Sequence, residues 1–397
     1  MTETKRHKMA KEMEAHLKQN ILPYWINKMT DPAGGYYGRR DADDTLHADA
    51  PRGAIMNARI LWTMSAAYRL TGDQNYLQAA SHAYDYIVRR FIDPEFGGVF
   101  QAVDSKGIPL DTKKQFYALA FMIYGLSEYH RASGDQSALN EAIALFRLIE
   151  KHSRDREKGG YFEAMTRDWK PVDDMRLSEK DANSCKTMNT HLHILEAYSA
   201  LYRVWPDETL REALTSLIVL TLNKIVDSKS GHLGLFFDRD WNREDGDISY
   251  GHDIEASWLL LEAAQTLGDT AFFDVVKTAT GKIADAALEG RCFDGSMIYE
   301  RHRSGSYDNE KHWWVQAENV VGQLYLWKFH GLEGFDDKAL QTWEYIKEKI
   351  VDNQNGEWYW SRLSDGSVNL KEDKAGYWKC PYHNGRMVME SIRILQN

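Results

Sequence analysis

The sequence predicts an all-α fold, an (α/α)6 barrel of twelve helices with short β-hairpins in the long loops at one end. Three observations predict this fold: a short turn pattern occurs six times, two helices fall within each repeat, and the connections alternate between short and long. Supersecondary units repeated at a steady spacing are typical of solenoids and closed rings. The chain has no polar capping repeat, which favours the ring over an open solenoid. We therefore expect residues 1–397 to form a single domain.

The repeated pattern is an acidic residue, a few further residues, a glycine, and then aromatic or β-branched residues. Successive glycines lie 61 to 72 residues apart, and the fifth copy is degraded. The pattern indicates a turn that leads into a short strand, and a second turn downstream of most copies makes a hairpin the expected structure. The six glycines are Gly34, Gly97, Gly159, Gly231, Gly295 and Gly356.

Between these turns the hydrophobic period changes to that of helices. The short connections contain residues that end one helix and cap the next, as in Thr71-Gly-Asp-Gln74. Every second helix is more apolar, so we expect those helices, including 188–201 and 254–264, to form an inner ring. The predicted helices are 10–28, 54–71, 75–91, 112–132, 136–153, 187–205, 208–226, 250–267, 270–288, 311–330, 335–351 and 381–396.

Composition excludes several classes of function. The chain has 49 basic and 59 acidic side chains and no basic cluster, so we expect no nucleic-acid partner. No apolar run reaches the roughly 18 residues of a membrane span, so we expect no membrane partner. A charged N-terminus without a signal peptide and three scattered cysteines favour a cytoplasmic location. We expect a monomer, with a dimer as the alternative.

The predicted inner helices begin with polar residues, which an all-round apolar helix would not carry. These starts contain Asn57 and Arg59, Tyr117, Asn189 with His191 and His193, His252 with Glu255, Trp313 with Trp314 and Glu318, and His383. Six helix starts meet at one mouth of a barrel, so we expect a common pocket there. His193, His252 and His383 are expected at matching places in their repeats.

Each of these residues also has a structural interpretation. A single histidine in a helix is more often structural, and Arg59 could close an ion pair. His191 fits a structural role better than His193. These two residues are two positions apart and face different sides of a helix, and the chain has no HExxH motif or cysteine cluster. We therefore expect no metal site.

Three imidazoles and an arginine suit proton transfer at a centre that becomes anionic. Aromatic side chains suit the apolar faces of sugar rings. A glycosidase needs a pair of carboxylates around the scissile bond, whereas the groups best placed here are histidines. This pattern favours isomerisation or epimerisation of a sugar over hydrolysis.

Several segments resemble the cellobiose 2-epimerases, which belong to the N-acylglucosamine 2-epimerase superfamily of (α/α)6 barrels. The resemblance rests on residues 51–62, 188–193, 251–262, 312–314 and 381–386. It implies one catalytic domain that reversibly epimerises C2 of the reducing-end sugar in β-1,4-linked disaccharides. Cellobiose would become glucosylmannose, and lactose would become epilactose. The implied course is ring opening, a cis-enediolate, reprotonation and ring closure, with no cofactor and no metal.

The resemblance also implies roles for individual residues. His252 and His383 match two bases on opposite faces of C2, and Arg59 matches the group that steadies the enediolate. His193 matches a partner near O1 and the ring oxygen, and Glu255 is placed to assist. The implied substrate contacts are Tyr117, Asp181, Asn189 and Trp314, with Trp378 as a stacking platform and Glu300 at the distal sugar.

Three alternatives stay open at this point. The first is a mannobiose 2-epimerase or a mannose aldose–ketose isomerase on the same scaffold. The second is an oligosaccharide hydrolase or lyase, because (α/α)6 barrels host such chemistry too. The third is a sugar-binding module without activity. For the epimerase we expect histidines with pKa values near 6.5, one neutral and one charged, and hence a bell-shaped pH profile.

Overall fold

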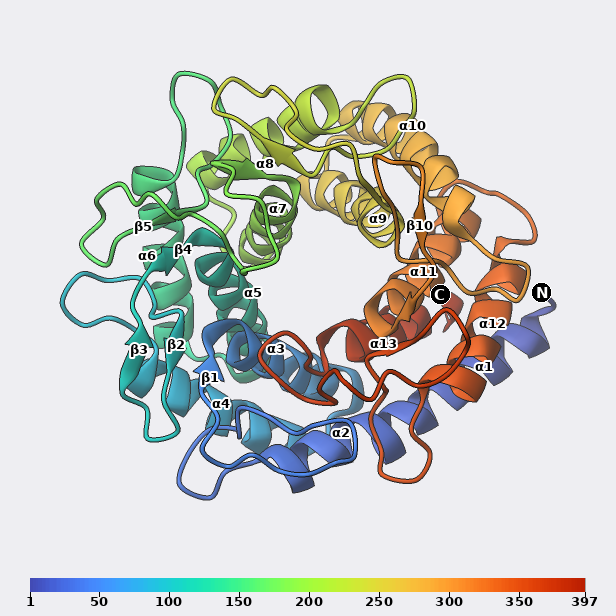
Figure 1. The fold of residues 1–397 in the computed structure, drawn as a ribbon, viewed down its shortest axis with the longest axis horizontal. Coiled ribbons are helices and arrows are strands. Elements are labelled where there is room, and N and C mark those ends of the chain that lie inside the picture. Colours follow the sequence, from blue (N-terminus) through green and yellow to red (C-terminus); the bar gives the residue numbers. More distant parts are fainter. Residues whose placement is uncertain (397) are drawn as a thin grey trace.

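Six inner helices form a closed ring in the computed structural model, which describes residues 1–396. Each inner helix contacts the next, and the last contacts the first (Figure 1). The predicted (α/α)6 barrel is therefore confirmed. The inner helices are α3 (Ala54–Thr71), α5 (Phe116–Ser133), α7 (Met188–Tyr202), α9 (Tyr250–Leu267), α11 (Trp313–Lys328) and α13 (Tyr382–Gln396).

An outer layer of helices covers this ring. The N-terminal helix runs as α1 (Glu3–His16), η1 (Leu17–Ile21), α2 (Leu22–Tyr24) and η2 (Trp25–Met29), and α1 packs against α13 to complete the sixth pair. The remaining outer helices are α4 (Gln74–Arg90), α6 (Gln136–His152), α8 (Glu208–Leu220) with η3 (Thr221–Ile225), α10 (Thr270–Ala287) with η4 (Leu288–Gly290), and α12 (Phe335–Tyr345) with η5 (Ile346–Ile350). None of the helices in residues 1–396 has the length and apolar character needed to cross a bilayer.

Three predicted helix starts differ from the structure by more than one residue, and one of them is the helix predicted from residue 311, which begins at Trp313 because Lys311 and His312 form a strand. The first helix begins at Glu3 rather than at residue 10, because the Thr2 side chain accepts a hydrogen bond from the backbone of Lys5 and caps it. The helix predicted from residue 112 begins at Phe116, because Lys114 and Gln115 form a strand instead.

All six copies of the repeated turn adopt the same structure. Each copy follows an outer helix and is closed by an antiparallel β-bridge, such as Thr30 with Tyr36 and Val351 with Trp358. The glycine of every copy has a positive φ, from 71° at Gly97 to 128° at Gly34. A β-carbon disfavours this conformation, so the pattern needs glycine at this position.

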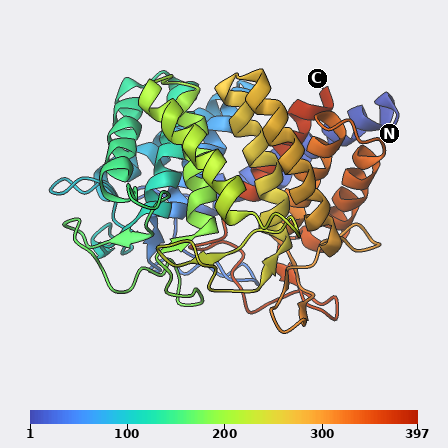
Figure 2. The same ribbon diagram turned by 90° about the horizontal axis from the view of Figure 1, so that it is seen from above.

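Short strands tie these loops to the starts of the inner helices. Five strands directly precede an inner helix, and each pairs with a strand from the following loop. The sheets are β1 (Arg52–Gly53), β2 (Ala102–Val103) and β3 (Pro109–Asp111); β4 (Lys114–Gln115) and β5 (Ala164–Met165); β6 (Lys186–Thr187) and β7 (Phe236–Phe237); β8 (Ile248–Ser249), β9 (Glu300–Arg301) and β10 (Tyr307–Asp308); and β11 (Lys311–His312) and β12 (Ser361–Arg362). The long loops gather at one end of the barrel, where they surround its mouth (Figure 2).

Buried ion pairs fix the same loops. The turn aspartates Asp93 and Asp155 accept hydrogen bonds from Lys114 at 2.8 Å and Lys186 at 2.9 Å, and these lysines lie just before α5 and α7. Breaking one such pair leaves an uncompensated buried charge, which is strongly destabilising. The turns and the helix starts are therefore held in one arrangement.

Candidate active site

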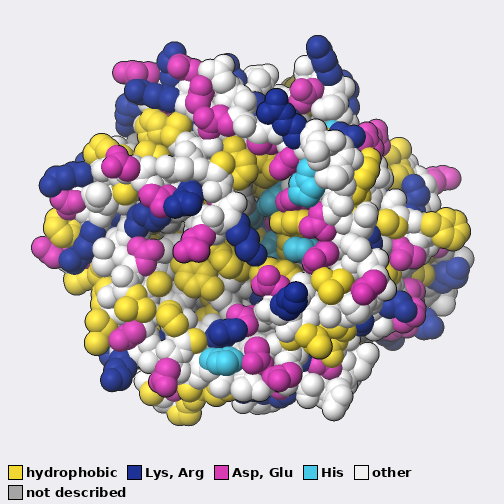
Figure 3. Space-filling model, viewed as in Figure 1, with side chains coloured by type: hydrophobic (Ala, Val, Ile, Leu, Met, Phe, Trp, Pro, Cys, Tyr) yellow, Lys and Arg dark blue, Asp and Glu magenta, His cyan; other side chains and the backbone are white. Residues whose placement is uncertain are grey.

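A layer of side chains crosses the barrel about one turn below its mouth. Arg59 stacks on Phe121 at 4.0 Å, and the rings of Phe121 and His193 lie 4.6 Å apart. Figure 3 shows the hollow at the centre of this face, with histidine and acidic side chains inside it. The layer consists of Arg59, Phe121, His193, Glu255 and Glu318, each the sixth residue of its helix, and Arg386, the fifth residue of α13.

The expectation that His193, His252 and His383 occupy matching places is wrong. His193 is the sixth residue of α7, whereas His252 is the third of α9 and His383 the second of α13. His252 and His383 therefore lie in the first turn at the mouth, and His193 lies one turn deeper.

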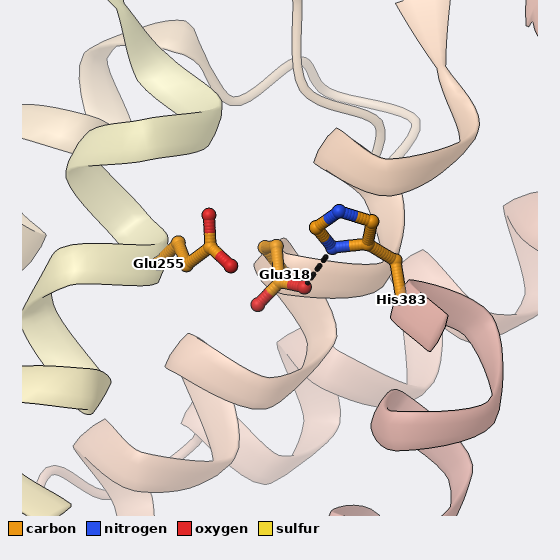
Figure 4. A group of neighbouring side chains, drawn as sticks. All are labelled: Glu255, Glu318 and His383. Atoms are coloured by element: carbon orange, nitrogen blue, oxygen red, sulfur yellow. Dashed lines mark hydrogen bonds and ion pairs between the residues drawn. The ribbon is translucent and has the colours of Figure 1, made fainter. Parts of the chain in front are cut away.

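His383 is held by a carboxylate. Its Nδ1 lies 2.7 Å from Oε1 of Glu318 (Figure 4). Glu318 also accepts hydrogen bonds from Arg386 at 2.7 Å and from the indole of Trp258 at 3.0 Å. Neither of these two groups has a lone pair with which to accept, so they favour the ionised form of Glu318. An ionised Glu318 accepts the proton of Nδ1 and leaves Nε2 of His383 as the basic atom.

His252 is held by a hydroxyl group. Its Nδ1 lies 2.7 Å from Oγ of Ser249, the last residue of β8. Its ring centre is 4.7 Å from that of Trp314, and the ring centre of His383 is 5.7 Å from the same indole. Among residues 1–396, no protein group is hydrogen-bonded to Nε2 of His252 or of His383. Both Nε2 atoms are therefore available to a ligand.

His193 and Arg59 form the deeper part of the site. Nδ1 of His193 lies 2.9 Å from Glu196, and its ring meets Tyr117 edge-on at 5.0 Å. Arg59 donates a hydrogen bond to the Tyr117 hydroxyl at 2.9 Å and another to the carbonyl of Trp378 at 3.5 Å. Its Nε is buried without a protein partner, so the guanidinium keeps hydrogen-bonding capacity for an oxygen of a bound molecule.

Glu255 lies among other charged groups. It accepts a hydrogen bond from Arg386 at 2.5 Å, and burial together with the charge of Glu318 raises its pKa to about 7. Glu196 behaves in the opposite way. Burial raises its pKa, but Arg386 and His193 outweigh this effect and lower it to about 2. At neutral pH Glu196 is therefore ionised, whereas Glu255 is close to the midpoint of its titration.

A cavity of about 180 Å³ opens beside His252. Its walls include four of the predicted residues: His252, Asp181, Asn189 and Glu300. Oδ1 of Asn189 is buried and has no protein partner, and burial raises the pKa of Glu300 to about 7. The cavity is large enough for one sugar ring and offers it several polar groups.

All eleven predicted site residues lie at this mouth or in the layer of side chains below it. Asp181, Asn189 and Glu300 line the cavity with His252, whereas Arg59, Tyr117, His193 and Trp378 contact one another outside its lining. Trp314 contacts both His252 and His383. His191 has a structural place, because Thr187 O lies 2.6 Å from its Nδ1 and Tyr161 N donates to its Nε2.

Glu255, Glu318 and His383 also approach the geometry of a metal site, since one ligand atom of each lies within 4.8 Å of the others. Arg386 donates a hydrogen bond to both carboxylates, so a fixed cation already sits between them. This arrangement favours proton handling over metal ligation.

The sequence reasoning missed Glu196, Ser249 and Arg386. Each lies three residues from one of the predicted histidines on the same helix or at its start. Side chains at this spacing meet on one face of a helix. A polar or charged residue three positions from each predicted histidine could therefore have been predicted to contact it.

The expectation of ordinary histidine pKa values is also wrong. Burial, and then the electrostatic interaction with His193, lower the pKa of His252 to about 3. Burial, followed by Arg59 and Arg386, lowers the pKa of His383 well below 6.5. Both imidazoles are neutral in the free protein at neutral pH.

The chain is similar to known proteins over nearly its whole length. The profile of the N-acylglucosamine 2-epimerase (GlcNAc 2-epimerase) family matches residues 35–385. A cellobiose 2-epimerase of Bacteroides fragilis is 53% identical over 386 residues, which cover 97% of this chain and 98% of that protein. The structure of the cellobiose 2-epimerase from Bacillus thermoamylovorans B4167 has a TM-score of 0.93 at 39% identity and covers 98% of this chain and 99% of that one.

A D-mannose isomerase structure shares the fold at a TM-score of 0.86 and 22% identity, with 96% of this chain and 97% of that one covered. The barrel and its relatives define a carbohydrate epimerase, which is an isomerase. The chain belongs to the N-acylglucosamine 2-epimerase family, and the resemblance to cellobiose 2-epimerases found in its sequence is confirmed.

Proposed function

We propose that the protein reversibly epimerises C2 of the reducing-end sugar in β-1,4-linked disaccharides, converting cellobiose to glucosylmannose and lactose to epilactose. The observation that carries this proposal is the pair His252 and His383. Each ring is fixed through Nδ1, each presents a free Nε2, and both contact Trp314 from different helices. Inversion needs a proton donor and acceptor on opposite faces, because one fixed base returns the proton to the face it left.

The other residues fit the remaining needs of this reaction. Arg59 remains charged and, through its unpartnered Nε, is suited to steady the oxygens of a cis-enediolate. Tyr117 orients that guanidinium, and His193 lies beside it for the O1 and ring-oxygen end of the sugar. The cavity lined by Asp181, Asn189 and Glu300 would bind the second sugar ring. Trp378 would stack on the substrate.

The proton balance assigns a task to Glu255. Both histidines are neutral, so one imidazole can accept the C2 proton, whereas the other has only its single N–H proton and must be resupplied after it donates to C2. With a pKa of about 7, Glu255 can both hold and release a proton near neutral pH, and it lies one turn after His252 on α9. The proton given to C2 would leave His252, and Glu255 would be the store that replaces it. The proton taken by His383 then returns to Glu255, whose carboxylate lies within 4.8 Å of the His383–Glu318 pair.

Proton exchange in D2O tests the proposal. The protein is incubated without added metal with cellobiose, lactose, mannobiose, mannose and N-acetylglucosamine, and the C2 proton and products are followed by NMR. We expect deuterium at C2 of cellobiose and lactose, with the disaccharide intact. Preference for mannobiose, or a ketose from mannose, would instead support the alternative epimerase or isomerase. Release of monosaccharide without exchange would mean hydrolysis, and binding without exchange a sugar-binding module.

A further inference from the structure

Arg386 is the most highly connected charged residue of the site, yet it faces no open part of the mouth. It lies 1% exposed on α13, one turn below His383. Its Nη2 donates hydrogen bonds to Glu255 at 2.5 Å and to Glu318 at 2.7 Å. Its Nη1 donates to Glu196 and to the Tyr382 hydroxyl. One guanidinium therefore binds carboxylates from three different inner helices, α7, α9 and α11.

Two of these carboxylates are the partners of histidines. Glu318 holds Nδ1 of His383, and Glu196 holds Nδ1 of His193. We propose that Arg386 is a positioning residue that keeps Glu318 and Glu196 ionised, and so fixes the tautomer that leaves Nε2 of His383 and of His193 free to accept a proton. This inference deepens the proposed function and rests on it for its effect on activity.

Electrostatics support this role. Three carboxylates buried together repel one another and favour proton uptake. The pKa of Glu318 is raised overall, because burial outweighs the groups that lower it, and the charge and hydrogen bond of Arg386 are the largest influences that limit this rise. Arg386 also contributes most to lowering the pKa of Glu196 against the effect of burial. Arg386 therefore offsets the negative charges of Glu318 and Glu196, and Glu255 is the carboxylate of the three that binds a proton.

The consequence for His383 follows from hydrogen-bond roles. An ionised Glu318 can only accept, so the imidazole carries its proton on Nδ1. A protonated Glu318 would donate to Nδ1, and the imidazole proton would move to Nε2. His383 would then present an N–H, not a lone pair, to the sugar, and could not begin the reaction as a base. The wrong tautomer is costly in other enzymes that use a carboxylate–histidine pair.

The groups that face Arg386 define how pH acts on this cluster. They are Glu196 from α7, Glu255 from α9, Glu318 from α11, the Tyr382 hydroxyl from α13, and, at longer range, Tyr124 from α5. The Trp258 ring covers the guanidinium at 4.6 Å. Both tyrosine pKa values are raised well above 10, mainly by burial, so the tyrosines stay neutral. Glu196, with a pKa of about 2, stays ionised, and Glu255, with a pKa of about 7, changes charge near neutrality.

The test uses two variants, Arg386→Lys and Arg386→Met, with selective ¹⁵N labelling of histidine. In the wild type we expect the His383 signals of an Nδ1–H tautomer, assigned by their loss in His383→Asn. Lysine keeps one charge but cannot donate to three carboxylates at once. We expect Arg386→Lys to lower kcat by at least about 100-fold with KM changed less than about threefold, and to move the acid limb of the pH profile upward. In Arg386→Met we expect the Nε2–H tautomer.

Lys114→Met is the matched control, because Lys114 is also a buried cation but pairs with Asp93 instead of with the carboxylates that hold the histidines. It should lose thermal stability and keep the wild-type pH profile and His383 tautomer. A wild-type His383 with its proton on Nε2 would overturn the inference even if neither Arg386 variant folds. The inference would also be overturned if His383 kept its wild-type tautomer in Arg386→Lys and the acid limb of the pH profile did not move. The NMR readout needs no substrate, so absence of C2 exchange in the wild type would sink the proposed function without touching this result.

Discussion

The two histidines at the mouth differ in what holds their Nδ1 atoms. His383 is bonded to Glu318, which Arg386 and Trp258 also hold, whereas His252 is bonded only to the hydroxyl of Ser249. A carboxylate stabilises the imidazolium that forms when the ring takes a proton, and a hydroxyl does so far less. The comparison teaches that the two faces of the sugar are not served by equivalent bases: the His383 side is built to accept a proton and the His252 side to pass one on.

The largest expected effect comes from removing either ring. His383→Asn and His252→Asn should each lower epimerisation by at least about 10⁴-fold, because each removes the proton acceptor or donor on one face. Each variant should still exchange the C2 proton of one epimer, since the other base remains. Exchange of cellobiose and of glucosylmannose in D2O, measured separately by NMR, checks this.

His191→Asn is the control for this pair, because His191 is buried in the same region but bonds only to backbone. It should lower thermal stability and leave both exchange rates near wild type. If either active-site variant still interconverted the epimers at the wild-type rate, the two-base arrangement would be wrong.

The second-largest effect is expected when the negative charge of Glu318 beside His383 is removed. Glu318→Gln keeps the size of the side chain but cannot balance the imidazolium, so kcat should fall by about 10²- to 10⁴-fold while KM changes little. Steady-state kinetics with cellobiose measures both constants. Glu150→Gln, a change in a buried carboxylate bonded to Tyr161 and Tyr198, should affect only stability. Equal loss of kcat in both variants would remove the special place of Glu318.

The fold was predictable because each repeat carries its own evidence. Gly97 and its counterparts need a positive φ, and Asp73, Asp135, Asp207 and Asp269 cap helices with their own side chains. These signals are local in sequence. The start of α5 was misplaced because Lys114 and Gln115 pair with Met165 and Ala164 from the next loop, and no local pattern shows such a partner.

The candidate site was predictable only in part, for the same physical reason. The helix starts and the resemblance identified the histidines and Arg59, but Glu196 and Arg386 are 190 positions apart and meet only because the ring closes. The low pKa values of His252 and His383 likewise depend on burial by the whole barrel. Residue type and spacing carry no information about that burial.

The effect on the His252 side should be much smaller. Ser249→Ala removes one neutral hydrogen bond, worth about 1 kcal/mol, so kcat should fall by about tenfold or less. Ser257→Ala, on the same helix as His252 but bonded to the carbonyl of Ile254, is the control and should leave kcat unchanged. A loss in Ser249→Ala as large as in Glu318→Gln would show that the two sides are equivalent and break the comparison.

The smallest effect is a displacement of the pH limbs. Protonation of a base removes activity as pH falls, and burial lowers the pKa of His252 to about 3, so kcat/KM for cellobiose should hold well below pH 6.5.

The alkaline limb of the pH profile depends on Glu255, because the proposed reaction needs a proton on this carboxyl group. Its pKa of about 7 means that the group is protonated below pH 7 and loses its proton above it, so kcat should fall by up to about tenfold per pH unit above that value. Glu255→Gln should lose this alkaline limb along with most activity, whereas Glu300→Gln should keep it, although burial gives Glu300 a similar pKa. An acid limb at pH 6.5 would mean that an imidazole titrates as if it were exposed. If the alkaline limb disappeared in Glu300→Gln alone, the proton store would be Glu300 in the cavity wall and not Glu255 in the catalytic layer.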